Sequence, residues 1–321
     1  MSHPASEPPL PDRLHYLDAL RGLAALCIPL WHWQHFFHRG TQAMRFDRER
    51  LPAFDVLAPL YLEGWRAVDL FFCLSGFVFF LLYADRVARR RVGARDFAWL
   101  RASRLYPLHL ATLLLVAALQ WLYRARFDAP FVFPFNDAYH FVLNLAFVSA
   151  WGFEQGFSFN APVWSVSVEV LLYGLFFVLC RAGWHRVGVL ALLVVVGIEL
   201  RGFGLPMIGR GVTGFFMGGL VVHAFHFLRR RTPGTPLLVG AGLGVAALYG
   251  AAPLPGLAWE LVVFPATVLW LALVEVRGAP SSRLLGFLGD VSYSTYLLHF
   301  PLQIVFVLGA VSLGLRPRAF F

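Results

Sequence analysis

The sequence predicts an all-α polytopic integral membrane protein, a bundle of about nine or ten transmembrane helices. Hydrophobic residues make up 59% of its 321 residues and charged residues only 14%, whereas a soluble domain carries about 25% charged residues. Apolar runs of 15–25 residues recur along almost the whole chain, and this is the length of an α-helical span. Residues 17–315 are therefore expected to form one membrane domain after an N-terminal tail, residues 1–16.

Apolar length, and the Gly, Pro and Arg residues that interrupt it, place nine strong spans along the chain. They are 17–37, 66–84, 105–123, 162–180, 186–200, 211–228, 235–251, 257–276 and 288–313. A weaker stretch, 135–151, contains the polar residues Asn136, Asp137, His140 and Asn144. We expect it to lie in the interface or to re-enter rather than to cross the membrane, because of the charge distribution described next.

The positions of arginine predict which side of the membrane each loop faces. Residues 85–104 hold seven arginines and two aspartates, and positively charged loops stay in the cytoplasm. The N-terminal tail is then cytoplasmic as well. The next basic run, Arg229–Arg231, is cytoplasmic only if 135–151 does not cross. Residues 38–65 give a modest opposing signal, since they carry four arginines among interspersed acids.

The net charge of +9 does not predict nucleic acid binding, because arginines between helices are the usual pattern of membrane topology. All three cysteines fall in apolar runs without the spacing of a metal site. His32, His35 and His38 have a spacing that a metal site could use, but no cysteine or acidic motif accompanies them. We therefore predict no metal.

The first span carries Arg21 near one end and His32 near the other, eleven residues apart. An arginine at the membrane centre costs about 2.5–3.5 kcal/mol even on lenient scales. Eleven residues of α-helix turn through about 1100° and rise about 16 Å, so the two side chains lie on one face at different depths. The alternative is that Arg21 extends to the interface and His32 is an interfacial polar residue.

Three further ionisable residues lie inside predicted spans, namely Asp69, Glu169 and His299. With the N-terminus inside, Asp69 and Glu169 fall in the outer half with His32, and His299 lies beyond the midpoint. Such groups face a bundle interior or a cavity, because they are costly in lipid. The alternatives are a helix-starting acid for Asp69 and a satisfied core histidine for His299. Three arginines gather at the cytoplasmic end: Arg21, Arg101 and Arg104.

Five stretches of the chain follow one another between about residues 15 and 305: LDALRGLAALCIPLWH, GWRAVDLFFCLSGF, RASRLYP, PVWSVSVE and LGDVSYSTYLLH. In this order they resemble the motifs of the membrane acyltransferase 3 family. One departure is Ala67, where glycine is common in that family. The family also usually continues through another apolar span after the last motif. Either a final C-terminal helix is missing from this chain, or the C-terminus lies outside.

The resemblance implies an enzyme that moves an acyl group, commonly acetyl, from cytoplasmic acyl-CoA to a hydroxyl of an extracytoplasmic or membrane-presented acceptor. The usual acceptor is a glycan or glycolipid of the bacterial surface, and the expected location is the cell inner membrane. On this basis the candidate catalytic residues are His32, Glu169, His299 and Asp69. The candidate ligands of acyl-CoA are Arg21, Arg101 and Arg104.

The chemistry of ester formation suggests a role for each group. Histidine is a suitable general base because its ordinary pKa, about 6.5, is near working pH, so we expect His32 to take the proton of the hydroxyl. Glu169 would orient His32 or stabilise its protonated form, and an acyl-histidine intermediate fits equally well. Arginine forks bind phosphate bidentately, which suits the phosphates of the donor. The alternatives are a proton-coupled transporter, although no two symmetric halves are seen, and a non-catalytic envelope scaffold.

Overall fold

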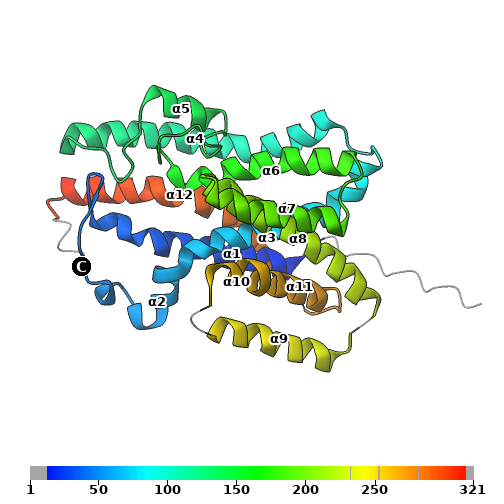
Figure 1. Ribbon diagram of the computed structural model, residues 1–321. Helices are drawn as coiled ribbons and strands as arrows, with labels where there is room; N and C mark the ends of the chain where they lie inside the picture. The colour runs from blue at the N-terminus through cyan, green and yellow to red at the C-terminus, as the bar shows by residue number, and fades with distance from the viewer. Residues whose placement is uncertain (1–12, 232, 252–253, 281, 316–321) are drawn as a thin grey trace, which may run out of the picture.

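The computed structural model describes residues 13–231, 233–251, 254–280 and 282–315 (Figure 1). Its N-terminal half consists of α1 (His15–Trp31), η1 (His32–Phe37), β1 (His38–Arg39), β2 (Gln42–Ala43), η2 (Arg48–Arg50), α2 (Phe54–Glu63), η3 (Gly64–Arg66), α3 (Ala67–Ala88) and α4 (Ala94–Phe127). Then follow α5 (Ala138–Leu145), η4 (Ala161–Val163), α6 (Trp164–Arg181), α7 (Val187–Gly202), α8 (Pro206–Arg230), α9 (Thr235–Gly250), α10 (Gly256–Ala258), the π-helical η5 (Trp259–Val263), α11 (Phe264–Glu275) and α12 (Arg283–Ser312). In the described residues the only strands are β1 and β2, which pair antiparallel with His38 opposite Ala43. The predicted all-α class is confirmed.

Six helical segments are long and apolar enough to cross a membrane: Phe54–Ala88, Ala94–Phe127, Ala161–Arg181, Pro206–Arg230, Gly256–Glu275 and Arg283–Ser312. Of the other three predicted spans, 17–37 forms α1, of 17 residues, continued directly by the six residues of η1, whereas 186–200 and 235–251 form α7 and α9, of 16 residues each. At 1.5 Å per residue α7 and α9 each rise about 24 Å, less than the roughly 30 Å of a hydrocarbon core. The chain is thus a multi-pass membrane protein, and six of the nine predicted spans lie in helical segments long and apolar enough to cross a membrane.

The weak stretch 135–151 forms only α5, eight residues long. Such a helix rises about 12 Å, which is too short to cross a membrane. Its polar side chains are used in folding the segment: Asp137 accepts a hydrogen bond from the backbone N–H of His140 at 2.9 Å, and the His140 ring donates to the same carboxylate at 2.9 Å. These two N–H groups lower the pKa of the Asp137 carboxyl. The expectation of a non-crossing segment agrees with this geometry.

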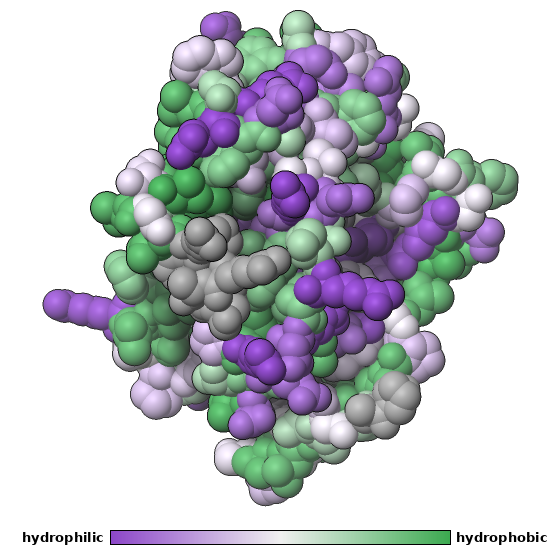
Figure 2. Space-filling model, turned by 90° about the vertical axis from the view of Figure 1, so that its left-hand side faces the viewer, coloured by the Kyte–Doolittle hydropathy of each residue, from purple (hydrophilic) through white to green (hydrophobic). Residues whose placement is uncertain are grey.

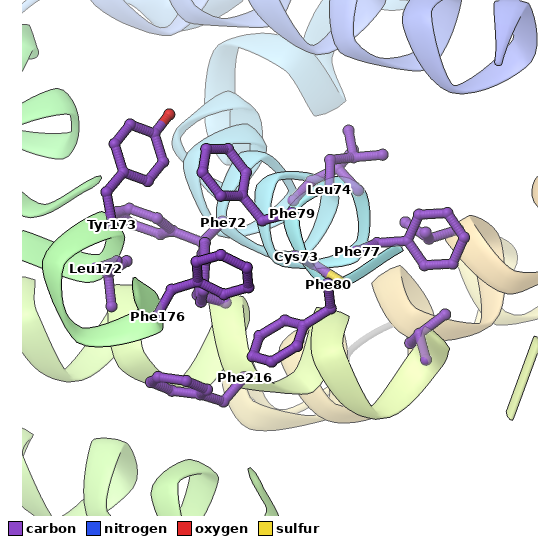
Figure 3. Close-up of a cluster of buried hydrophobic side chains, with 14 of the residues drawn as sticks. Phe72, Cys73, Leu74, Phe77, Phe79, Phe80, Leu172, Tyr173, Phe176 and Phe216 are labelled. Atoms are coloured by element: carbon purple, nitrogen blue, oxygen red, sulfur yellow. The ribbon is translucent and has the colours of Figure 1, made fainter. Parts of the chain in front are cut away.

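The centre of the bundle is an aromatic core formed by α3, α6 and α8 (Figure 3). Phe79 stacks on Tyr173 with ring centroids 4.3 Å apart, and Phe80 meets Phe176 edge to face at 4.9 Å. In a bilayer such contacts stabilise by close packing, since lipid is as apolar as the side chains and small residues let helices approach. Gly76 provides that approach, because a Cβ there would lie 1.9 Å from the carbonyl oxygen of Phe215.

Helices α1 and α12 lie side by side at the edge of this core, although their sequences are more than 250 residues apart (Figure 1). A Cβ on Gly22 of α1 would lie 2.4 Å from the carbonyl oxygen of Leu288, so only glycine permits the contact. The first turn of α1 is held by Glu275 of α11, whose carboxylate accepts the backbone N–H groups of His15 and Tyr16. A carboxylate at a helix N-terminus satisfies unpaired amides and complements the helix dipole.

The two ends of the bundle differ in what they carry. Figure 1 shows η1, α2 and the C-terminal end of α12 at one end, and the connections from α3 to α4 and from α6 to α7 at the other. Figure 2 views the first of these ends, where hydrophilic residues gather among hydrophobic ones. The candidate catalytic histidines belong to η1 and α12, and therefore lie towards this end.

Candidate active site

His32 is the first residue of η1, directly after α1, and His299 lies in α12. The structure brings them together: His32 Nδ1 and His299 Nε2 are 3.0 Å apart, and the rings are stacked with centroids 4.9 Å apart. His299 is buried, whereas His32 is partly exposed. Two residues that the sequence separates by almost the whole chain therefore form one hydrogen-bonded pair.

The contacts of His299 fix the proton positions of this pair. Its Nδ1 is 2.7 Å from the carbonyl oxygen of Tyr296, which can only accept, so Nδ1 carries a hydrogen. In a neutral ring Nε2 is then an acceptor. His32 must therefore donate from Nδ1, and its Nε2 holds a free lone pair. This atom has no hydrogen bond within the described residues, so its lone pair is available to accept a proton.

Glu169 lies elsewhere, in a cavity of about 420 Å³ between α1, α3, α4, α6 and α12. Its carboxylate accepts a hydrogen bond of 2.6 Å from the Ser75 hydroxyl. Within the described residues no hydrogen bond joins Glu169 to His32, and His32 and His299 do not line this cavity. The sequence-based hypothesis that Glu169 orients His32 therefore finds no direct contact to support it.

The cavity follows α12 from Asp290 to Tyr296, whose ring is 6.0 Å from that of His299. Its polar lining is mainly of two kinds. Carboxylates and hydroxyls come from Asp18, Ser75, Ser165, Glu169, Asp290, Ser292, Tyr83, Tyr173, Tyr293 and Tyr296, and guanidinium groups come from Arg13, Arg21, Arg101 and Arg104. The cavity thus connects an arginine-rich end with the neighbourhood of the histidine pair.

All three arginines predicted to bind the donor line this cavity, and they differ in how they are held. Arg21 donates to Asp18 at 2.7 Å and to the Ser292 hydroxyl at 3.2 Å. Arg101 donates to the Tyr83 hydroxyl at 2.9 Å, and its Nε is buried without a partner among the described residues. Arg104 is exposed and makes no hydrogen bond or ion pair within the described residues.

Arg13 was not singled out from the sequence, although it lines the same cavity. It pairs with Asp18 at 2.5 Å and with Asp290 at 2.6 Å. These hydrogen bonds, that to Asp290 first, raise the pKa of the Arg13 guanidinium. The arginine cluster is therefore partly neutralised by two carboxylates, one from α1 and one from α12.

Asp69 belongs to a different region. It is 2% exposed and accepts a hydrogen bond of 2.8 Å from Arg210 of α8, whose guanidinium lies between the rings of Trp65 and Trp164 at 5.0 and 5.1 Å. Asp69 does not line the cavity. Its ion pair with Arg210 joins α3 to α8. Asp69 therefore has a structural partner and does not lie beside the other candidate residues.

Sequence reasoning missed Arg13, Ser75, Arg210, Asp290 and Gln303. Ser75 and Asp290 lie inside quoted motifs, so their polar character in an apolar context was a usable signal. Arg210 falls one residue before the predicted span 211–228 and was not counted as an intramembrane charge. No group of three His, Cys, Asp or Glu side chains in the described part of the chain could hold a metal ion.

Comparison with known sequences gives the family. The acyltransferase 3 family, described as an acyltransferase domain, matches residues 14–320. The chain belongs to this family. It is therefore an acyl-transferring enzyme of the membrane, and the family identified from five motifs is confirmed. No solved structure matches the chain significantly.

Three curated proteins are similar to this acyltransferase. The exopolysaccharide production protein ExoZ of Rhizobium meliloti (strain 1021) is 32% identical over 271 residues, 78% of this chain and 81% of that protein. Acyltransferase MdmB of Streptomyces mycarofaciens is 27% identical over 329 residues, 91% of this chain and 80% of that protein. Protein 2 in the picA locus of Rhizobium radiobacter is 36% identical over 108 residues, which is 34% of this chain and 46% of that protein.

Proposed function

We propose that this enzyme is an O-acyltransferase that takes an acyl group from acyl-CoA and esterifies a hydroxyl of an extracytoplasmic or membrane-presented glycan. The observation that carries the proposal is that α1 and α12 extend from the arginine-lined cavity, to which α1 contributes Arg21 and α4 contributes Arg101 and Arg104, to the pair of His32 and His299. Donor recognition and proton transfer then occur at two points along the same helix pair.

The arginine end of the cavity suits the donor. Acyl-CoA carries a pyrophosphate and a ribose phosphate, and guanidinium groups bind such oxyanions with charge-assisted hydrogen bonds. Arg104 makes no hydrogen bond or ion pair in the described part of the chain that a phosphate would have to replace, while Arg21 and Arg101 are oriented by Ser292 and Tyr83. We assign these three arginines to donor binding and this end of the bundle to the cytoplasm, where acyl-CoA is available.

The histidine pair suits the transfer step. As the acceptor hydroxyl attacks the thioester carbonyl, its proton passes to His32 Nε2, the C–O bond forms, and the C–S bond breaks. The proton is then available to the departing thiolate, so the enzyme returns to its starting protonation. His299 accepts from His32 Nδ1 throughout and stabilises the imidazolium. An acyl-histidine on the same Nε2 remains an alternative route with the same products.

The name of one relative supports the acceptor class, and the name of another supports acyl transfer. One is an exopolysaccharide production protein and the other an acyltransferase. We therefore propose a cell-surface polysaccharide or glycolipid as acceptor, acetyl as the acyl group, and the cell inner membrane as the location. The transporter alternative draws no support from these relatives.

The test is acyl transfer by the purified protein in lipid nanodiscs. Acetyl-CoA and longer acyl-CoA thioesters are supplied with surface polysaccharide from cells that lack the gene, and free CoA and the mass of the polysaccharide are measured by chromatography and mass spectrometry. CoA release matched by base-labile acyl esters on the polysaccharide is expected. Proton flux without consumption of any acyl-CoA would favour the transporter.

A further inference from the structure

The side chain of Gln303 joins two histidines of η1 to α12. Its Nε2 donates a hydrogen bond of 2.9 Å to the backbone carbonyl of His32, and its Oε1 is 3.0 Å from Nδ1 of His35. Gln303 is only 6% exposed. It lies four residues after His299, so both side chains occupy one face of α12. This face therefore contacts His32 twice, once at the ring and once at the backbone.

The chemistry of these contacts allows one arrangement. The His32 carbonyl can only accept, so the amide NH₂ of Gln303 faces it and the amide oxygen faces His35. His35 must then carry its hydrogen on Nδ1 and donate to that oxygen. His35 thereby holds the amide of Gln303 in the orientation that serves His32.

Three contacts fix His32. Its backbone N–H donates to the carbonyl of Ile28, its carbonyl accepts from Gln303, and its ring Nδ1 donates to His299. His32 also stands where α1 gives way to the 3₁₀ turn η1, a junction between two backbone geometries. With these three contacts made, Nε2 is the one polar atom of His32 without a partner in the described part of the chain, and it remains for a substrate.

We propose that Gln303 is a positioning residue that holds His32 Nε2 in line for proton transfer, and that His35 acts through Gln303 by fixing its amide. This inference rests on the proposed function and deepens it. Displacing a reacting group by about 1 Å can lower a rate by about 100-fold. Neither residue needs to touch a substrate for this effect.

The decisive variant is Gln303→Glu. It keeps an oxygen for the Nδ1–H of His35 and loses the donor to the His32 carbonyl. We expect kcat to fall by about 10- to 100-fold while KM for acetyl-CoA stays unchanged, because the donor cavity is not altered. A Gln303→Glu protein with wild-type kcat would overturn the proposal.

Gln120→Glu is the matched control. Gln120 is 3% exposed, lies in α4, and also makes two hydrogen bonds through its amide, both to the backbone of Phe131. The same chemical change there should lower the temperature of unfolding without changing kcat per folded molecule. Equal losses of kcat in Gln120→Glu and Gln303→Glu would reduce Gln303 to a structural residue and overturn the proposal.

His35 provides a second test that does not depend on the folding of the Gln303 variant. His35→Leu removes the donor to Gln303 and should lower kcat. His35→Asn places an N–H near the Nδ1 position but has nothing at Nε2, and it should restore most of the activity that His35→Leu loses. If His35→Asn is as inactive as His32→Ala, then His35 is itself a base and the positioning role is wrong. Absence of acyl transfer in the wild-type protein would instead overturn the proposed function.

Discussion

The arginine-lined cavity and the histidine cluster lie along the same helices, but their polar groups are satisfied to different degrees. Among the residues that the structure describes, Arg104 of the cavity has no hydrogen-bond or ion-pair partner and Arg101 has an unpaired Nε, and carboxylates only partly balance the charge. In the histidine cluster, His299 and Gln303 each form a neutral hydrogen bond with His32, and His35 forms one with Gln303. The cavity is open to receive charge, whereas the cluster leaves one ring nitrogen of His32 unbound.

This difference indicates how one small membrane domain can place donor binding and proton transfer in separate regions. Unpaired cations inside a membrane protein are costly unless an anion or water joins them, so they gather in a cavity that a phosphate can enter. A general base instead needs a fixed position and a defined protonation state. Variants in the two regions should accordingly change different kinetic constants.

The largest expected effect comes from the histidine cluster. His32→Ala removes the base and should lower kcat by about 10²- to 10⁴-fold without changing binding of acyl-CoA, because its side chain lies outside the cavity. Single-turnover rates and donor titration on the same preparation measure the two quantities. Wild-type turnover in His32→Ala would remove histidine from the mechanism and end the distinction between the regions.

A substitution in the cavity should instead weaken binding of acyl-CoA. Arg21→Lys keeps the charge but cannot reproduce the planar contacts to Asp18 and Ser292. We expect donor affinity to weaken by about 1–3 kcal/mol, which is about 5- to 150-fold, with normal membrane levels. Isothermal titration with acetyl-CoA measures it.

Arg66→Lys is the control for this variant. Arg66 pairs with Glu63 at 2.7 Å and does not line the cavity, so donor affinity should stay at the wild-type value. If Arg21→Lys also binds acetyl-CoA normally, then Arg21 only extends to the interface and the cavity is not the phosphate site.

The effect of changing Glu169 depends on whether this residue acts with the cavity or with the histidine cluster. If it belongs to the cavity through Ser75, Glu169→Gln should change KM for the donor by about tenfold, or about 1.4 kcal/mol, and leave the acidic limb of the pH–rate profile unmoved. If it supports His32 as the sequence suggested, that limb should shift to lower pH, because the neutral amide no longer favours the imidazolium. A pH profile of kcat decides between them.

Cysteines introduced to report the membrane topology are expected to have no effect on activity. In intact cells a cysteine near Arg90 or Arg230 should be shielded from a membrane-impermeant thiol reagent, and one near Gly156 should react, because the proposed orientation puts the arginine end of the cavity inside. Labelling near Arg230 would mean that 135–151 crosses the membrane after all. If the cysteine near Arg90 is the only one that reacts with the reagent, the proposed direction of acyl transfer is reversed.

Part of the fold could be read from the sequence because it depends on local properties. Apolar length predicted the helices, and the eleven-residue spacing placed Arg21 and His32 on one face of the first span. The distribution of arginines predicted that the weak stretch 135–151 does not cross the membrane, and α5, of eight residues, agrees with this. The bounds of α7 and α9 agree with the predicted spans 186–200 and 235–251 to within two residues. The full length of α4 could not be read in this way: it has 34 residues, Ala94–Phe127, and extends well beyond the predicted span 105–123.

Only part of the candidate site could be predicted from the sequence in the same way. The motifs identified the family and drew attention to His32, Glu169, His299 and the three arginines, because ionisable groups in apolar runs are rare. They could not show that Glu169 contacts Ser75, that Asp69 contacts Arg210, or that Gln303 contacts two histidines. Each of these pairs is decided between helices, and no local pattern encodes the partner.

The sequence by itself determined that this chain is a helical membrane protein of the acyltransferase 3 family, and it identified some of the polar groups that lie within its helices. The reason is that hydrophobic length and helical period act within a segment of about 20 residues. Tertiary structure decided that α1 lies on α12 with Gly22 against Leu288, and that the free nitrogen of His32 is Nε2. These follow from close packing and from which atoms can donate or accept across an interface, and both depend on residues more than 250 positions apart.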